Sequence, residues 1–398
     1  ADSVIFDTIN QKKNTRVLTR QTWDNLNNFA HKTDLKLFFT VNAGPSVRDI
    51  HHQWQTENLE SLLRYSKKRG YKIEAFEFGN EINAFWFFHG FTNRITVGQY
   101  IDDFKKFRIL VKKYYPYTKV GGAATIYWPR VGEAFSFVGA MTPVFIKEGV
   151  DVNMFTWHYY PQQSSRCPIS FPQAKHGLLL NPQNLNDIGT WAIKLASLKK
   201  RFNPHAELWL GEIGHALCGG QSGISDTFES SLWWTDVLGF MAVKGQSIIV
   251  RQDLIGADYS LLDKQTLNPL PDFWASFLWK KLMGTKVFKV FTSEDNPYIR
   301  TYAHSTNTSS GYQQGAITIV FINLQNKKNA VMFKNINTDE VVMYQLSAIS
   351  LNEKSVLLNG KRLVLVDDGV PVLKGKSIKI KNKNLDLIPF SITYLIFP

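Results

Sequence analysis

The strings FGNE at residues 78–81 and WLGE at residues 209–212 decide the fold class of this chain. Each closes an apolar run, turns at a glycine and then presents a glutamate. In a chain of alternating strands and helices, this order places a carboxylate at the C-terminal end of a barrel strand, where such barrels carry their active sites. Two carboxylates that face each other across one pocket are what the cleavage of a glycosidic bond requires.

Apolar strands alternate with amphipathic helices on both sides of these strings. Strands are expected at 35–42, 73–81, 119–125, 152–160, 207–212 and 247–254, and helices at 56–69, 97–115, 131–147, 185–201, 226–243 and 272–283. This alternation predicts a parallel sheet that helices cover on both faces. The sequence contains six such strands, two fewer than a closed (β/α)8 barrel needs.

The pattern changes after residue 284, where short strands follow one another without helices. They are expected at 286–292, 299–304, 316–323, 341–346, 356–358, 363–366, 377–380 and 392–397. Asn359-Gly360, between two apolar runs, predicts a tight hairpin. We therefore expect a catalytic barrel domain at residues 1–285 and a β-sandwich domain at residues 286–398.

Composition restricts the classes of partner. The chain has 398 residues and is 44% hydrophobic, which is typical of a globular protein with two domains. Its formal net charge of +13 favours a polyanionic partner. The sequence contains neither zinc-ligand spacing nor a glycine-rich phosphate loop, so we expect an acidic polysaccharide rather than nucleic acid. It has no apolar run long enough to cross a bilayer and no signal-type stretch near its start.

Seven strings occur in the order and near the spacing of one known family: FEFGNE, TWHYY, LWLGE, GISDTF, VRQ, YSLLD and NPLPDFW. The chain resembles the heparanase family, retaining endo-β-glucuronidases of glycoside hydrolase family 79 whose relatives include the leech hyaluronidase. The resemblance extends from about residue 12 to the C-terminus. Because a small subunit of animal heparanase supplies the first strand, helix and second strand, the resemblance implies a large subunit. The six strands would then be the third to eighth of a (β/α)8 barrel that a small subunit or N-terminal segment completes.

The resemblance also implies roles for the residues of the two opening strings. Glu81 corresponds to the acid/base, Glu212 to the nucleophile, and Asn80 to the residue that holds the 2-hydroxyl of the sugar. In a retaining enzyme the two carboxyl groups lie roughly 5–5.5 Å apart. The acid must hold a proton near neutral pH while the nucleophile stays ionised.

Other matches concern the pocket. His158 corresponds to a pocket histidine and Tyr160 to a tyrosine that orients the nucleophile; two residues apart on one strand, their side chains share a face. Tyr259 corresponds to a contact of the uronic acid carboxylate, which the backbone N–H groups of Gly219 and Gly220 also approach.

The chain departs from the family beside this glycine loop. The family has Tyr-Gly-Gly-Gly where this sequence has Leu217-Cys218-Gly219-Gly220. Cys167 is the only other cysteine, and two cysteines are too few for a disulfide framework. The sequence leaves open whether Cys218 is inert, is paired with Cys167 or is a free thiol.

Basic residues provide the expected contacts with sulfated chains. Lys12, Lys13, Arg16 and Arg20 match one basic stretch of the family. Arg130 begins a second stretch, whose remaining basic residues are replaced by Val131, Gly132 and Glu133. A solvated surface without a ligand is the alternative interpretation of the first stretch.

We therefore expect a secreted, extracellular or lysosomal glycoside hydrolase that cleaves glucuronidic linkages in heparan sulfate-type glycosaminoglycans. The expectation includes no metal and no organic cofactor. One alternative is an enzyme of the same fold that cuts hyaluronan or removes terminal glucuronate. A second alternative is a non-catalytic, heparanase-like protein that binds glycosaminoglycans.

Overall fold

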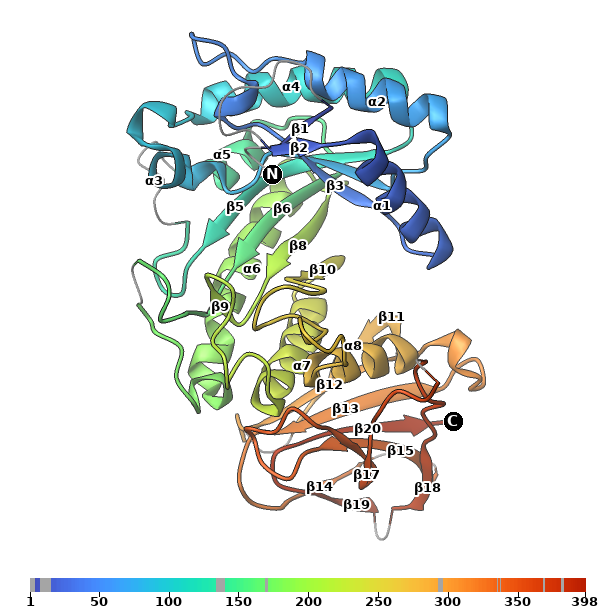
Figure 1. Ribbon diagram of the computed structural model, residues 1–398. Coiled ribbons are helices and arrows are strands. Elements are labelled where there is room, and N and C mark those ends of the chain that lie inside the picture. The colour runs from blue at the N-terminus through green and yellow to red at the C-terminus, as the bar shows by residue number, and fades with distance from the viewer. Residues whose placement is uncertain are drawn as a thin grey trace. The chain divides into compact units, whose positions relative to one another are not determined.

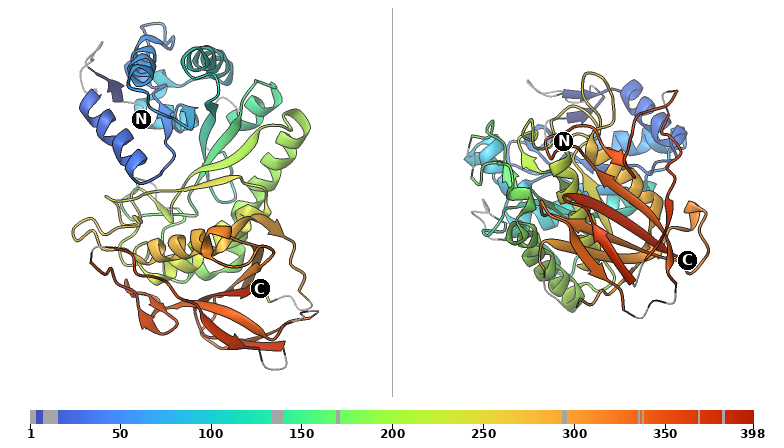
Figure 2. Two further views of the ribbon diagram at one scale, coloured as in Figure 1. Left: turned by 90° about the vertical axis from the view of Figure 1, so that its right-hand side faces the viewer. Right: turned by 90° about the horizontal axis from the view of Figure 1, so that it is seen from below.

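A computed structural model describes residues 4–7, 16–133, 140–168, 171–292, 296–334, 336, 338–367, 369–380 and 383–398. The chain forms two compact units (Figures 1 and 2). Unit 1 consists of residues 1–159, 193–212 and 246–250, and unit 2 of residues 160–192, 213–245 and 251–398. The two units combine separate segments of the chain and do not divide it at residue 285. The domain boundary predicted there stays a prediction.

Unit 1 is built around a six-stranded sheet with the order β10-β8-β6-β5-β4-β3. These strands are β3 Phe38–Val41, β4 Ala75–Phe78, β5 Lys119–Tyr127, β6 Met154–Tyr159, β8 Glu207–Ile213 and β10 Ile248–Arg251. The pairs β3–β4, β4–β5 and β5–β6 are parallel. The six-stranded parallel sheet predicted from the sequence is therefore confirmed, as half of a barrel whose edge strands are β3 and β10.

Helices accompany these strands, most of them in the expected alternation. They are α1 Arg20–Lys32, α2 Glu57–Arg69, α3 Phe85–His89, α4 Val97–Tyr114, α5 Met141–Lys147 and α6 Pro182–Phe202. A short parallel pair, β1 Val4–Phe6 and β2 Arg16–Leu18, precedes α1. Helices α2 and α4 lie side by side in Figure 1.

The two faces of the half-barrel are both apolar at its base. On the helix side, Phe78 packs against Trp54 and Phe107 with ring centroids 4.8 and 5.1 Å apart. On the inner side, Ala75 and Met154 form a cluster with Trp209. Burial on both faces explains why these strands consist of nearly continuous apolar residues.

Unit 2 contains α7 Phe228–Val243, α8 Pro271–Leu282 and an antiparallel sheet with the order β11-β12-β13-β20-β15-β16-β17. The strands are β11 Met283–Phe288, β12 Ile299–Thr306, β13 Ile317–Asn323, β15 Glu340–Ser347, β16 Leu357–Leu358, β17 Lys361–Arg362 and β20 Ser391–Phe397, with β18 Lys376–Lys379 paired to β15. Two further pairs are β14 Asn329–Met332 with β19 Asn384–Leu387, and β7 Gln162–Gln163 with β9 Ala216–Leu217. The separate antiparallel domain is confirmed, and the sandwich arrangement stays a prediction.

The hairpin predicted at Asn359-Gly360 is also confirmed. It joins β16 to β17, and both residues have positive φ, 50° and 81°. Such a two-residue turn matches the twist of the strands that it connects.

Three details of the sequence prediction are wrong or incomplete. The helix expected from residue 131 begins only at Met141; residues 131–133 form a turn, and 134–139 lie outside the described residues. The strand expected at 363–366 is not formed. Helix α1 and the strands β1, β2, β14 and β19 were not expected. None of the helices in the described ranges has the length and apolar character that a bilayer crossing needs.

Candidate active site

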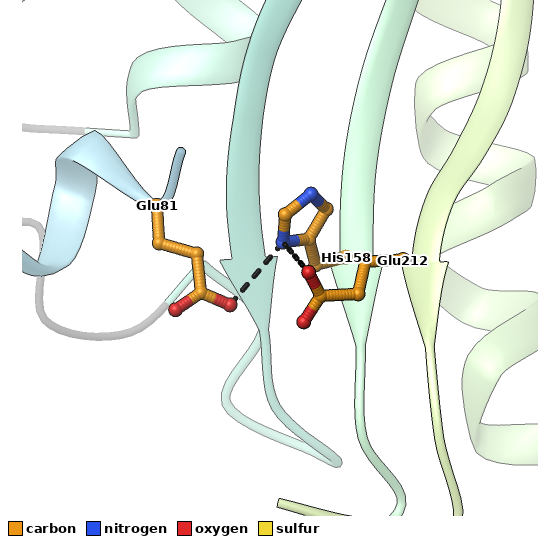
Figure 3. Close-up of side chains that lie close together, drawn as sticks. All are labelled: Glu81, His158 and Glu212. Atoms are coloured by element: carbon orange, nitrogen blue, oxygen red, sulfur yellow. Dashed lines mark hydrogen bonds and ion pairs between the residues drawn. The ribbon is translucent and has the colours of Figure 1, made fainter. Parts of the chain in front are cut away.

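Three ionisable side chains meet at one end of the unit 1 sheet (Figure 3). Glu81 follows β4, His158 lies near the end of β6, and Glu212 lies near the end of β8. Because the C-terminal ends of parallel strands meet at one edge of a sheet, residues far apart in the sequence converge there. The structure thus brings both predicted catalytic glutamates together with the predicted pocket histidine.

The distances are those of direct interaction. Nδ1 of His158 lies 3.2 Å from Oε1 of Glu81 and 3.9 Å from Oε2 of Glu212. One carboxylate oxygen of each glutamate and a ring nitrogen of the histidine all lie within 4.8 Å of one another. The Glu81 and His158 side chains are 9% and 2% exposed, whereas that of Glu212 is 23% exposed. Glu212 is therefore the more accessible carboxylate.

The turn that carries Glu81 explains the glycine of FGNE. Gly79 has φ 77°, and a Cβ there would lie 2.3 Å from the side chain of Ile82. Glu81 itself has φ 50°, and its backbone N–H donates to the carbonyl of Ala124 at 2.7 Å. These features direct the carboxylate back toward His158 rather than along the strand. Asn80, between the two, is half-buried.

His158 carries a positive charge at neutral pH. Burial lowers its pKa, but the charge of Glu212, the hydrogen bond and charge of Glu81 and the charge of Glu77 together raise it to about 9. The ligand atoms of the three side chains are close enough together to surround a metal ion. Without a metal ion, they form two carboxyl groups beside a protonated histidine.

A third carboxyl group lies beneath these residues and was not singled out in the sequence. Glu77, on β4, is only 2% exposed, and Oε2 accepts a hydrogen bond from the hydroxyl of Thr40 on β3 at 2.7 Å. Burial raises its pKa, against the opposing effects of His158 and the hydroxyls of Thr156 and Thr40. The signal was present in FEFGNE, because an acidic residue between two buried phenylalanines is unusual.

Unit 2 contains Tyr160, predicted to orient the nucleophile, and the predicted uronate contacts Tyr259, Gly219 and Gly220. Tyr160 and Tyr259 are both buried, with ring centroids 6.3 Å apart. Gly219 and Gly220 have φ of 85° and 82°. The N–H of Gly220 already donates to the carbonyl of Ala216 at 3.0 Å, and the roles of these four residues stay predictions.

A disulfide resolves the state of the cysteines, because Cys167 is joined to Cys218. The neighbouring Arg166 donates to the carbonyls of Gly219 and Gly220 at 3.0 and 2.6 Å and pairs with Asp258 at 2.8 Å. The altered glycine loop is thus held by one covalent bond and one guanidinium.

The basic residues are only partly described. Lys12 and Lys13 lie outside the described residues, whereas Arg16 and Arg130 are exposed. Arg20 pairs with Asp7 at 2.9 Å. Glu133, in the second stretch, accepts from the backbone N–H groups of Met141 and Thr142 at the start of α5. Burial raises the pKa of Glu133 to about 7.

Comparisons with known proteins agree with this architecture. The crystal structure of a 4-O-α-L-rhamnosyl-β-D-glucuronidase from Fusarium oxysporum superposes with a TM-score of 0.72 at 15% identity, over all of this chain and 86% of the other. At that identity the likeness shows the fold alone.

Sequence relatives are more informative. Heparanase of Bos taurus is 32% identical over 97% of this chain and 69% of its own length. Inactive heparanase-2 of Homo sapiens is 30% identical over 91% of this chain. The hyaluronoglucuronidase of Hirudo nipponia is 29% identical over 91% of this chain and 73% of its own length. The chain spans 62% of the length of heparanase-2, from human and from mouse.

A family model described as glycosyl hydrolase family 79, N-terminal domain, matches residues 13–239. That match covers β3 to α6 and β8, including Glu81, His158 and Glu212. Together with the heparanase relatives, it confirms the resemblance inferred from the seven strings. The chain therefore belongs to glycosyl hydrolase family 79, the family of the heparanases.

Proposed function

We propose that the protein is a retaining endo-β-glucuronidase that cleaves glucuronidic linkages in heparan sulfate-type glycosaminoglycans. One observation carries the proposal: an oxygen of Glu81 and an oxygen of Glu212 lie within 4.8 Å of each other. Carboxyl groups roughly 5–5.5 Å apart suit a retaining mechanism, whereas an inverting enzyme needs about 6.5–9.5 Å to place a water molecule between them.

In the first step Glu212 attacks the anomeric carbon while Glu81 donates its proton to the departing glycosidic oxygen. The bond from carbon to Glu212 forms as the bond to the leaving group breaks. In the second step Glu81 takes a proton from water, which attacks the same carbon and releases Glu212. Asn80 precedes Glu81 in the turn after β4, and we assign it the sugar 2-hydroxyl, as the resemblance to the family implies.

His158 supplies a fixed positive charge beside the negative charge that moves between the two glutamates during this cycle. Before reaction the negative charge is on Glu212, and in the covalent intermediate it is on Glu81. The imidazolium lies within 3.9 Å of both. A fixed positive charge between the two positions favours each state without reorganisation, which is how preorganised sites lower barriers.

The substrate class is inferred from charge and relatives. A formal net charge of +13 favours a polyanion, and the relatives are named heparanase and hyaluronoglucuronidase. Hyaluronan is the second candidate, because the Glu133 side chain binds the start of α5 in a stretch that is basic in the family. In the third candidate, a non-catalytic protein similar to inactive heparanase-2, no substrate would be cut.

Two accompanying proposals concern assembly and location. The half-barrel ends at β3 and β10, so a strand-helix-strand segment from a small subunit or an N-terminal region would complete it. The disulfide between Cys167 and Cys218 is typical of oxidising compartments, which supports a secreted, extracellular or lysosomal protein.

The test is to incubate the protein, with the barrel-completing segment present, with heparan sulfate and with hyaluronan, and to size the products. Shorter heparan sulfate chains are expected, and Glu212→Gln should abolish their formation. An activated 2-fluoro-glucuronide should label Glu212, identified by peptide mass spectrometry, and the label should persist in Glu81→Ala. Products from hyaluronan alone would favour the second candidate, and no products from either polymer would favour the third.

A further inference from the structure

Glu77 occupies a place that barrel interiors normally fill with apolar side chains. It lies on β4, four residues before Glu81, and its register partner on β3 is Thr40. The layer at the base of the sheet is apolar, with Ala75, Met154 and Trp209. A carboxyl group just above that layer loses its hydration, a cost that proteins bear where the group is paired or functional.

The surroundings of Glu77 are shaped for a carboxylate. The hydroxyl of Thr40 donates to Oε2 at 2.7 Å, and that of Thr156 also hydrogen-bonds the group. Oε1 lies 3.5 Å from the position that a Cβ on Gly211 would take. Gly211 precedes Glu212, so the glycine of WLGE gives the Glu77 carboxyl close access to the backbone beside the proposed nucleophile.

The residues around Glu77 are next to His158 on the same face of the sheet. Thr156 and His158 are two residues apart on β6, so their side chains share a face. His158 is faced by Glu81 after β4, Glu212 on β8 and Glu77 beneath. The charge of Glu77 also contributes to the raised pKa of Tyr100 on α4. The hydroxyl of Tyr100 donates to the carbonyl of Phe78 at 2.9 Å. Within the described residues, His158 is thus the cation among three carboxyl groups.

We propose that Glu77 is a positioning residue whose negative charge, from the layer beneath the catalytic glutamates, keeps His158 in its imidazolium form through both steps of the reaction. Neither glutamate can do this alone, because each loses its charge in one half of the cycle: Glu81 is protonated at the start, and Glu212 is esterified in the intermediate. Glu77 takes part in neither step, so the reaction itself does not change its charge. The inference rests on the proposed function for its catalytic consequence, but not for its electrostatic one.

The sign of the effect follows from charge. Removing a negative charge from a cluster weakens proton binding by every neighbour, whichever group titrates first. Glu77→Gln keeps the shape of the side chain and removes the charge. The pH at which His158 loses its proton should therefore fall by about 1 pH unit, the lower end of what one nearby charge produces. The same loss of negative charge weakens proton binding by Glu81, so the alkaline limb of the kcat/KM profile, where the acid loses its proton, should also move to lower pH.

The experiment measures both readouts in the active assembly. Histidine ring resonances of protein labelled with 13C at Cε1 are followed by NMR from pH 5 to 10, with His158→Gln identifying the signal. The profile of kcat/KM is measured on an aryl glucuronide. In Glu77→Gln we expect less than about threefold loss at the optimum but about tenfold loss one pH unit above the wild-type limb. Glu77→Asp should recover the wild-type profile in large part.

Two further variants keep the test decisive if Glu77→Gln does not fold. Thr40→Val removes the hydroxyl that favours the ionised form of Glu77 and should shift both readouts in the same direction by a smaller amount. Thr125→Val removes another buried strand hydroxyl, which bonds Thr142 instead, and should shift neither. A uniform loss of activity with unchanged limb and unchanged His158 titration would overturn the proposal. If the wild type cuts no glucuronide, the NMR titration still tests the electrostatic claim separately from the proposed function.

Discussion

Replacing His158 by glutamine should displace the whole pH–rate profile to higher pH. The imidazolium lies 3.9 Å from an oxygen of Glu212. At that distance and an effective dielectric constant of about 20, two unit charges interact by about 4 kcal/mol, which corresponds to about 3 pH units. Because the side chain of Glu212 is 23% exposed, solvent screens part of this interaction, and we expect a displacement of roughly 1–2 pH units.

The direction has a simple origin. Without the cation, the site binds protons more tightly, so the nucleophile becomes protonated at a higher pH and the acid keeps its proton to a higher pH. The assay is kcat/KM on an aryl glucuronide between pH 3 and 10. The displacement is opposite in sign to that expected for Glu77→Gln, so the pair of variants tests the charge model from both sides.

His215 provides a matched control. It is fully buried, and burial lowers its pKa to about 3, so it is neutral above about pH 4, over nearly all of the assay range. His215→Gln can reduce stability or kcat, but it removes no charge and should leave both limbs in place. Refutation would be a His158→Gln enzyme that loses activity equally at all pH values, or a profile that moves to lower pH.

Four other outcomes are expected. Because the pKa of His158 is raised in the folded state, its contribution to stability is complete below about pH 6.5 and should be lost as pH rises through about 9, by about 3 kcal/mol; urea unfolding of wild type and His158→Gln at several pH values measures it. Reducing the disulfide, or Cys167→Ser with Cys218→Ser, should lower the free energy of unfolding by up to about 4 kcal/mol for a sequence separation of 51; a calorimetric transition insensitive to reductant would contradict this. Expressed without a strand-helix-strand segment, the chain should aggregate through β3 and β10, and co-expression should give a soluble protein with a cooperative melt; a soluble, active chain without that segment would disprove the partner. Neutralising Lys12, Lys13, Arg16 and Arg130 together should raise KM for heparan sulfate with kcat nearly unchanged, an effect that salt should reduce in the wild type; an unchanged KM would leave these residues without a substrate role.

The sequence predicted what depends on local pattern. β4 and β8 are continuous apolar runs that end in glycine and glutamate, and both strands and their placement in a parallel sheet were correct. The Asn359-Gly360 turn was predictable because a two-residue hairpin needs positive φ at both turn residues, and Asn followed by Gly is a pair that adopts this conformation readily. In each case the physical cause lies within a few residues of the chain.

Helix α1 and the strands β14 and β19 were missed for different reasons. Helix α1 buries only Trp23, Asn27 and Ala30. The side-chain amide of Asn27 donates a hydrogen bond to the backbone carbonyl of Trp23 at 2.8 Å. The apolar residues of α1 have helical spacing, so this helix had a local signal in the sequence that was overlooked. Strands β14 and β19 pair across more than fifty residues, so neither gives a local hairpin signal.

At the site, the sequence predicted that Glu81 and Glu212 would share one pocket, but not the charge of the histidine between them. Both glutamates were visible in the strings FGNE and WLGE, yet the protonation state of His158 depends on carboxyl groups on β4, in the turn that follows β4 and on β8. The pairing of Cys167 with Cys218 likewise depends on β7 and β9 lying side by side. Both properties depend on which charges and which cysteines the fold brings close together, and the local sequence does not contain that information.

Whether this family member is catalytic is decided by chemistry and not by identity. It is 32% identical to a heparanase and 30% identical to an inactive heparanase-2, a difference too small to discriminate. The arrangement around His158 is more informative, because three carboxyl groups and an imidazolium that share one site pay heavily in lost hydration. In the proposed reaction, negative charge moves between Glu212 and Glu81, and the buried Glu77 lies on β4 four residues before Glu81. The Glu77 variants therefore test the proposed mechanism as well as the stability of the site.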